Sequence, residues 1–102
     1  MIAQRDEATQ AAHDRLLPLF ADLERRLLRE QDHEAVDFFG EIARWIERAA
    51  NVDELMEPFM RLATTAFRGF ELAPDCHRLV DRILETAQTI SWTLSSDQEV
   101  SH

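Results

Sequence analysis

The sequence predicts an all-α protein, an up-and-down bundle of four antiparallel helices. Apolar residues recur every three or four positions in four segments, and no segment alternates with a period of two over the length of a strand. Only two glycines and three prolines interrupt the 102 residues. Because two to five residues separate consecutive segments, we expect successive helices to run antiparallel.

The first helical segment runs from about residue 9 to Glu30, after a polar stretch, residues 1–8, that we expect to be frayed. Its apolar residues share one side: Leu16, Leu17, Phe20, Leu23, Leu27 and Leu28. Pro18 lies within this segment. Since proline donates no backbone hydrogen bond and clashes with the preceding turn, a kink or a helix restart is predicted near Leu17.

The second segment runs from His33 to Ala50, and Asp32 is its candidate N-cap. Its apolar residues cover almost half of the circumference: Ala35, Val36, Phe38, Phe39, Ile42, Ala43, Trp45, Ile46 and Ala49. Gly40 lies in the middle, where glycine costs up to ~1 kcal/mol relative to alanine. We therefore expect another helix to approach closely at Gly40.

The third segment, from Val52 to Phe70, has the widest apolar arc, near 160° against the roughly 100° of an ordinary surface helix. Asn51 followed by Glu54 predicts a capping-box-like start, and Gly69 predicts the stop. Pro58 predicts a second kink. A helix with so wide an arc needs neighbours on more than one side.

Pro74 and Asp75 predict the start of a fourth helix, with proline in the first position and an acid in the first turn. Its apolar stripe consists of Cys76, Leu79, Val80, Ile83, Leu84, Ala87, Ile90 and Leu94. Residues 96–102 are polar and are expected to form a disordered tail. Residues 1–102 together are predicted to be a single domain, large enough for a core without metal or disulfide.

Composition narrows the function classes. Twenty acidic residues against eleven arginines give a net charge of −9, and such a surface repels nucleic acid and anionic lipid. The one cysteine, Cys76, cannot form an intramolecular disulfide, which favours a reducing compartment. The N-terminus has no apolar signal region and no run approaches the 18 apolar residues of a membrane span. We expect a cytoplasmic protein that binds neither nucleic acid nor membrane.

Glu24 is the charged residue that falls inside the apolar stripe of the first segment. One interpretation is structural, an ion pair with Arg44, Arg61 or Arg78 from a facing helix. The other is a working carboxylate with a raised pKa in an apolar pocket, with His13 as the second ligand-binding candidate. The structural interpretation is the one we adopt.

No metal site, cofactor or catalytic residue is predicted. Glu30 and His33 match half of a di-iron signature, but the second and third segments place no carboxylate or histidine in their apolar arcs. Cys76 lies on an apolar stripe, and its neighbour His77 points elsewhere on a helix, which favours a buried inert thiol over a nucleophile.

The surplus of apolar surface predicts an interface. The candidate interface residues are Phe38, Trp45, Met60, Phe67 and Trp92. The predicted function is a non-catalytic protein-interaction or regulatory module, a homodimer or an adaptor, joined through the second and third segments. The alternative is a small-molecule or metal-binding bundle with a pocket around Glu24.

Overall fold

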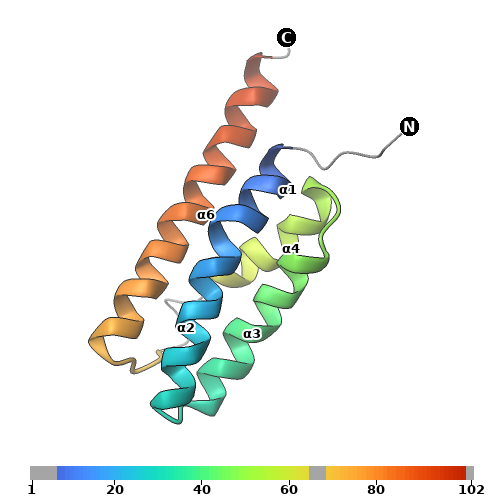
Figure 1. Ribbon diagram of the computed structural model, residues 1–102. Coiled ribbons are helices and arrows are strands. Elements are labelled where there is room, and N and C mark those ends of the chain that lie inside the picture. Colours follow the sequence, from blue (N-terminus) through green and yellow to red (C-terminus); the bar gives the residue numbers. More distant parts are fainter. Residues whose placement is uncertain (1–6, 65–68, 101–102) are drawn as a thin grey trace.

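The chain folds into four antiparallel helices, which confirms the predicted all-α bundle (Figure 1). A computed structural model describes residues 7–64 and 69–100, except for the side chains of residues 93–100. The helical elements are α1 (Glu7–Ala11), the π-helical segment η1 (Ala12–Leu16), α2 (Leu17–Arg29), α3 (His33–Arg48), α4 (Val52–Ala63) and α6 (Pro74–Val100). α1, η1 and α2 follow one another without a break and form the first of the four helices.

The π-helical segment η1 explains how the first helix keeps one side in the core. Ala8, Ala12, Leu16 and Phe20 are spaced four residues apart, and on a regular α-helix each such step drifts by about 40°. The wider turn of a π-helix takes up this drift. All four side chains are buried, with exposed fractions of 6%, 0%, 0% and 3%.

The kink or helix restart predicted near Leu17 takes the form of a change in helix type. α2 begins at Leu17, immediately after η1 and without a break, and Pro18 lies in its first turn. Since proline has no N–H to donate, the helix lacks one backbone hydrogen bond at the junction between the π-helical and the α-helical turns.

A Schellman turn joins α2 to α3. Gln31 adopts a left-handed backbone with a φ of 60°, its N–H donates to the Leu28 carbonyl at 3.1 Å, and the Asp32 N–H donates to the Leu27 carbonyl at 3.0 Å. The Asp32 carboxylate accepts a hydrogen bond from the Ala35 N–H at 3.2 Å, as predicted for the N-cap of α3. Asp32 therefore closes the end of α2 and the start of α3 at once.

α4 begins as predicted and ends earlier than predicted. The Asn51 side chain accepts from the Glu54 N–H at 3.1 Å, which confirms the N-cap. The helix ends at Ala63 and not at Phe70, and at its end the Thr64 hydroxyl donates to the Arg61 carbonyl at 2.7 Å. Residues 65–68, which include Phe67, lie outside the described residues.

Two further expectations on this segment have mixed outcomes. Gly69 has the left-handed φ of 68° expected of a stop residue, although α4 has already ended. Pro58 is buried inside α4, and the helix continues to Ala63 on its far side. Since proline has no N–H to donate, the helix loses one hydrogen bond at this point.

α6 is longer than predicted. Its backbone stays helical to Val100, five residues beyond Ser95, where the sequence suggested a tail. No glycine or proline interrupts it after Pro74, and polar residues can extend a helix that is already formed. In Figure 1 the C-terminal part of α6 reaches past the other helices, and the molecule is 47 Å long in its largest dimension.

The core lies mainly between α2, α3 and α6. Its largest fully buried side chains are apolar: Leu16, Leu23, Leu27, Phe39, Ile42, Ile46, Leu55, Leu62 and Ile83. α2 packs extensively on α3 and α6, and α3 packs extensively on α4. α4 and α6 contact each other much less, so the seam between them is loosely packed.

Candidate functional site

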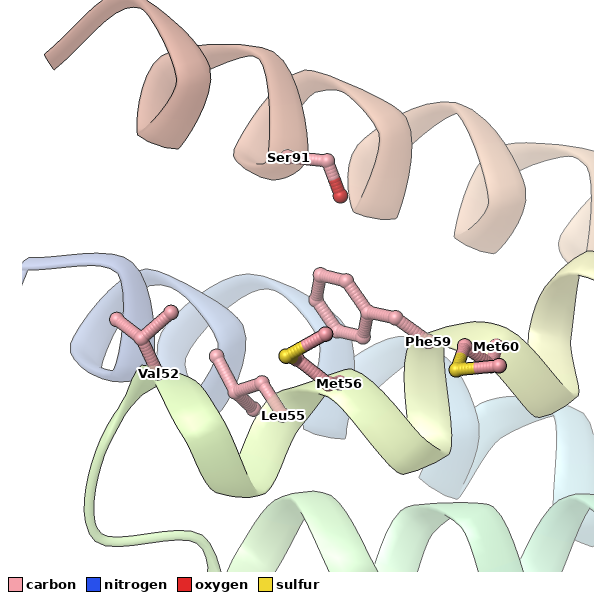
Figure 2. A pocket seen from close by; sticks show the side chains of 6 residues that line it. All are labelled: Val52, Leu55, Met56, Phe59, Met60 and Ser91. Atoms are coloured by element: carbon pink, nitrogen blue, oxygen red, sulfur yellow. The ribbon is translucent and has the colours of Figure 1, made fainter. Parts of the chain in front are cut away.

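A groove lies along the seam between α4 and α6. Figure 2 shows it, with α4 supplying five apolar side chains and α6 supplying one polar side chain. The lining residues are Val52, Leu55, Met56, Phe59 and Met60 from α4 and Ser91 from α6. The groove has a volume of about 210 Å³ and opens to solvent.

The residues of α6 explain why the seam stays open. Ala87 and Ser91 face this region with short side chains, whereas α4 presents a phenylalanine and two methionines. In Figure 2 the Phe59 ring points from α4 toward α6, on the side of Ser91. Small residues opposite large ones leave space that no side chain fills.

Two of the exposed large apolar side chains lie at this seam. Met56 is 59% exposed and Met60 is 62% exposed, both on the wall of the groove. Trp92 is 69% exposed on α6, but it does not line the groove and lies on the side of the helix away from the buried Ile90. The remaining large apolar side chain that is exposed among the described residues is Leu28, on α2.

Carboxylates border the groove on the side of α4. Asp53 lies within roughly 60° of both Met56 and Met60 around the helix axis, Glu57 lies within roughly 60° of Met60, and both acids are exposed. On α6, Glu85 is also exposed, but it lies roughly 120° around the helix from Ser91, on the face turned away from the groove. The site is therefore an apolar strip with an acidic border on α4.

Arg61, on the opposite flank of α4, is already engaged. Its guanidinium lies 4.7 Å from the centroid of the Trp45 ring, and its Nη1 lies 3.7 Å from Glu41 Oε1. These contacts join α4 to α3. Trp45 is half-buried beneath Arg61, so this flank of the predicted interface is covered within the molecule.

The structure corrects one predicted interface residue and retains two as exposed. Phe38 is a core residue, 8% exposed, and its ring contacts those of Phe39 and Phe70 with centroids 5.0 and 5.3 Å apart. Its place beside Phe70 could not be read from the wheel of one helix, because Phe70 comes from the segment before α6. Met60 is exposed on the wall of the α4–α6 groove, Trp92 is exposed on α6 outside the groove, and Phe67 is outside the described residues.

Glu24 lies in the contact between α2 and α3. Its Oε1 is 3.3 Å from the point that a Cβ on Gly40 would occupy, and Arg44 Nη1 is 3.7 Å from the same point. The neighbours of Gly40 are thus the ends of two side chains, and not the backbone of a closely approaching helix as predicted. Arg44 is the predicted partner that lies on this side, although the ion pairs within 4.0 Å among the described residues do not include Glu24.

His13 lies far from Glu24. It is half-buried on η1, eleven residues earlier, which corresponds to about 16 Å along a helix. Neither residue lines the α4–α6 groove or either of two other grooves. One of these, about 280 Å³, lies between the 69–72 segment and α6; the other, about 310 Å³, lies between α6 and the first helix.

Within the described ranges, no three histidine, cysteine, aspartate or glutamate side chains gather as a metal site would require. Cys76 is buried, as predicted, and burial raises the pKa of its thiol, with Glu30 acting in the same direction. The adjacent His77 is exposed and faces Asp81, with His77 Nδ1 3.3 Å from Asp81 Oδ2. Cys76 and His77 therefore do not form a nucleophile and base.

Of the residues that line the groove, the sequence analysis named Met60 as an interface candidate and did not name Val52, Met56, Phe59 or Ser91. The signal for the first three was the width of the apolar arc on α4, wider than α3 alone can cover. Ser91 gave no signal, because a serine on a helix is ordinarily a solvent-facing residue. Only the packing of α6 against α4 reveals it as a wall of the groove.

A search of the described part of the chain finds no helix that is long and apolar enough to cross a bilayer. Comparison with protein-family models, with curated proteins and with solved structures finds no match to this chain.

Proposed function

We propose that this protein is a non-catalytic interaction module that binds a helix of another polypeptide in the α4–α6 groove. The observation that carries the proposal is the pair Met56 and Met60, two large apolar side chains that are more than half exposed on the wall of the groove. Contiguous apolar surface of this kind on a monomer is typical of interaction sites.

The chemistry of this pair supports binding to protein. Methionine is enriched at protein interfaces, and it adapts its flexible side chain to different partners. From Val52 to Met60 the groove follows α4 for about 12 Å, or a little over two helical turns. An amphipathic helix that lays anchors at positions i, i+4 and i+7 into such a groove is a common mode of recognition.

A homodimer is the second form of this proposal. The second predicted helix, α3, supports a homodimer less than the third, α4, because Phe38 of α3 is in the core and Trp45 of α3 is covered by Arg61. A second copy would instead have to cover α4 and α6. The alternative function, ligand or metal binding near Glu24, has no support from the three grooves described above.

Site-specific photo-crosslinking in the source cells tests the proposal. A photoreactive residue placed at Met60 should give a discrete crosslinked product, and the additional change Met56→Asp should abolish it. The matched control carries the photoreactive residue at Asp37, which is exposed on α3 away from α4. Identical products from positions 60 and 37 would show that the seam is not a binding site.

The mass of the product separates the two forms. The chain has a mass of 11.9 kDa. A crosslinked product of twice this mass identifies a homodimer, and a product of any other discrete mass identifies a different partner. Because Met60 is 62% exposed, its replacement should leave the fold intact, which a thermal melt of the purified variant checks.

A further inference from the structure

We infer that the occupant of the α4–α6 groove is a basic amphipathic helix from a different protein, with Arg or Lys flanking an apolar face of about two turns. This inference rests on the proposed function and specifies the partner. It is carried by the charges that border the groove together with the apolar residues that line it.

The border on α4 is acidic along the length of the groove. Asp53 lies just outside Met56 and Met60 around the helix, and Glu57 lies next to Asp53 one turn further on. Both carboxylates are exposed, and neither takes part in the ion pairs of the described residues. Two unpaired acids beside an apolar strip favour a ligand that brings positive charge to that edge.

α6 contributes no acid to the groove, and Ser91 is the α6 residue that lines it. Glu85 is exposed on α6, but it lies roughly 120° around the helix from Ser91. A helix seated in the groove would therefore meet carboxylates on its α4 flank and apolar side chains below.

Charge argues against a second copy as the occupant. Each copy carries a net charge of −9, so pairing two α4–α6 seams would bring acidic borders together. A head-to-tail arrangement would need a basic face elsewhere on the molecule. The candidate is α2, where Leu28 is exposed between Arg25 and Arg29, but one leucine cannot fill a groove of more than two turns.

Two synthetic peptides of about 14 residues test the inference, each stapled so that it is already helical. They share one apolar face and differ only in their flanks, which are Arg in one and Glu in the other. Fluorescence anisotropy at about 50 mM salt measures their binding to the full chain. We expect the Arg peptide to bind about tenfold more tightly, with the difference shrinking as salt is added.

Charge-matched variants locate the effect. The double change Asp53→Asn with Glu57→Gln should remove the preference for the Arg peptide. The control, Asp37→Asn with Glu47→Gln, neutralises two exposed acids on α3 and should preserve the preference. An equal loss in both double variants would show that the peptide responds to net charge alone, and would overturn the inference.

Apolar variants separate the inference from the proposed function. Met56→Ala with Met60→Ala should weaken both peptides, because each uses the same apolar strip. Equal affinity of the two peptides, lost in this variant, would retain the interaction module and overturn the basic partner. Binding of neither peptide would overturn the inference, and concentration-dependent self-association abolished by Met60→Asp would identify a second copy as the occupant.

Discussion

The two long seams of this bundle differ in how they close. Between α2 and α3 the turn residues cap both helices, and Gly40 lets the Glu24 carboxylate come within 3.3 Å of the Cβ position. Between α4 and α6 large side chains face small ones, and a groove of about 210 Å³ remains. The connecting segments differ too, since three residues link α2 to α3 whereas ten residues separate α4 from α6.

The difference shows that apolar content does not decide which seam closes. α4 has as marked an apolar face as α3, yet Met56 and Met60 stay more than half exposed while Phe39 is 2% exposed. What decides is the size of the residue opposite and the distance at which the connecting turn holds the helices. One seam therefore contributes stability, and the other leaves surface available for binding.

The largest contrast is expected from truncating one apolar side chain on each seam. Phe39→Ala should lower the free energy of unfolding by about 3–5 kcal/mol, because it empties a site in the core. Met60→Ala should lower it by less than about 0.5 kcal/mol, because the side chain is already largely in water. Urea titration of both variants against the wild type measures the two values. Comparable losses would mean that the α4–α6 seam is closed in solution.

The second prediction concerns Cys76, which lies beneath the α2–α3 turn. The chain has no lysine and no tyrosine, so Cys76 is the one side chain that titrates between about pH 8 and about pH 11. Burial, and next Glu30, raise the pKa of its thiol in the folded protein. The unfolded chain therefore loses this proton first, and the free energy of unfolding should fall as the pH rises above the unfolded pKa.

Measuring unfolding at pH 8 and at pH 10 checks this, with Cys76→Ala as the control. Between pH 8 and pH 10 the free energy of unfolding should fall further in the wild type than in the variant. This additional fall should be smaller than the loss expected from Phe39→Ala. The variant lowers the baseline through the cavity that it leaves, so the comparison is between slopes and not between absolute values. Parallel slopes would show that the thiol is open to water in the folded state.

A smaller effect is expected at the turn that closes the α2–α3 seam. Gln31 holds a φ of 60°, which costs a residue with a side chain about 1–2 kcal/mol. Gln31→Gly should therefore raise the free energy of unfolding by about 0.5–1 kcal/mol, after the greater flexibility of glycine in the unfolded chain is offset. Gln31→Ala keeps the side-chain penalty and serves as the control. A loss of stability with glycine would mean that the Gln31 side chain supports the turn.

The smallest effect is expected at Gly40. Gly40→Ala should raise the free energy of unfolding by about 0.5 kcal/mol, since alanine favours the helix and the Glu24 carboxylate, at the end of a flexible side chain, can move aside. Gly40→Leu should destabilise, because the larger side chain cannot be accommodated. If alanine also destabilises and Glu24→Ala reverses that loss, then Glu24 is held firmly in the α2–α3 contact.

Much of the fold could be predicted from the sequence, because it depends on local features. Periodicity identified the four helices, and short polar side chains at Asp32 and Asn51 marked two of the starts. The early end of α4 could not be predicted, because the apolar pattern continues past Ala63 to Phe70 and no glycine or proline stands between Ala63 and Gly69. The length of α6 was missed because polarity was taken to end a helix that nothing interrupts.

The candidate site was predictable only in part. The exposure of Met60 and of Trp92 can be predicted from the pattern of a single helix, because the core has no room for either side chain. The groove depends on which side chains of α6 lie opposite those of α4. Phe59 and Ser91 come together from two helices although 32 positions separate them in the sequence. For the same reason Phe38 was misassigned, since its partner Phe70 reaches the core from outside a helix.

The π-helical segment η1 has a consequence for how the chain can vary in length. It holds one residue more than a regular helix would use over the same rise, and this surplus sets the phase between α1 and α2. Deleting one residue there would allow an unbroken α-helix, yet it would rotate α1 by about 100° and turn Ala8 away from α6. Homologous chains should therefore gain or lose residues before Glu7 or in the 64–73 connection, and keep the count between Ala8 and Phe20 fixed.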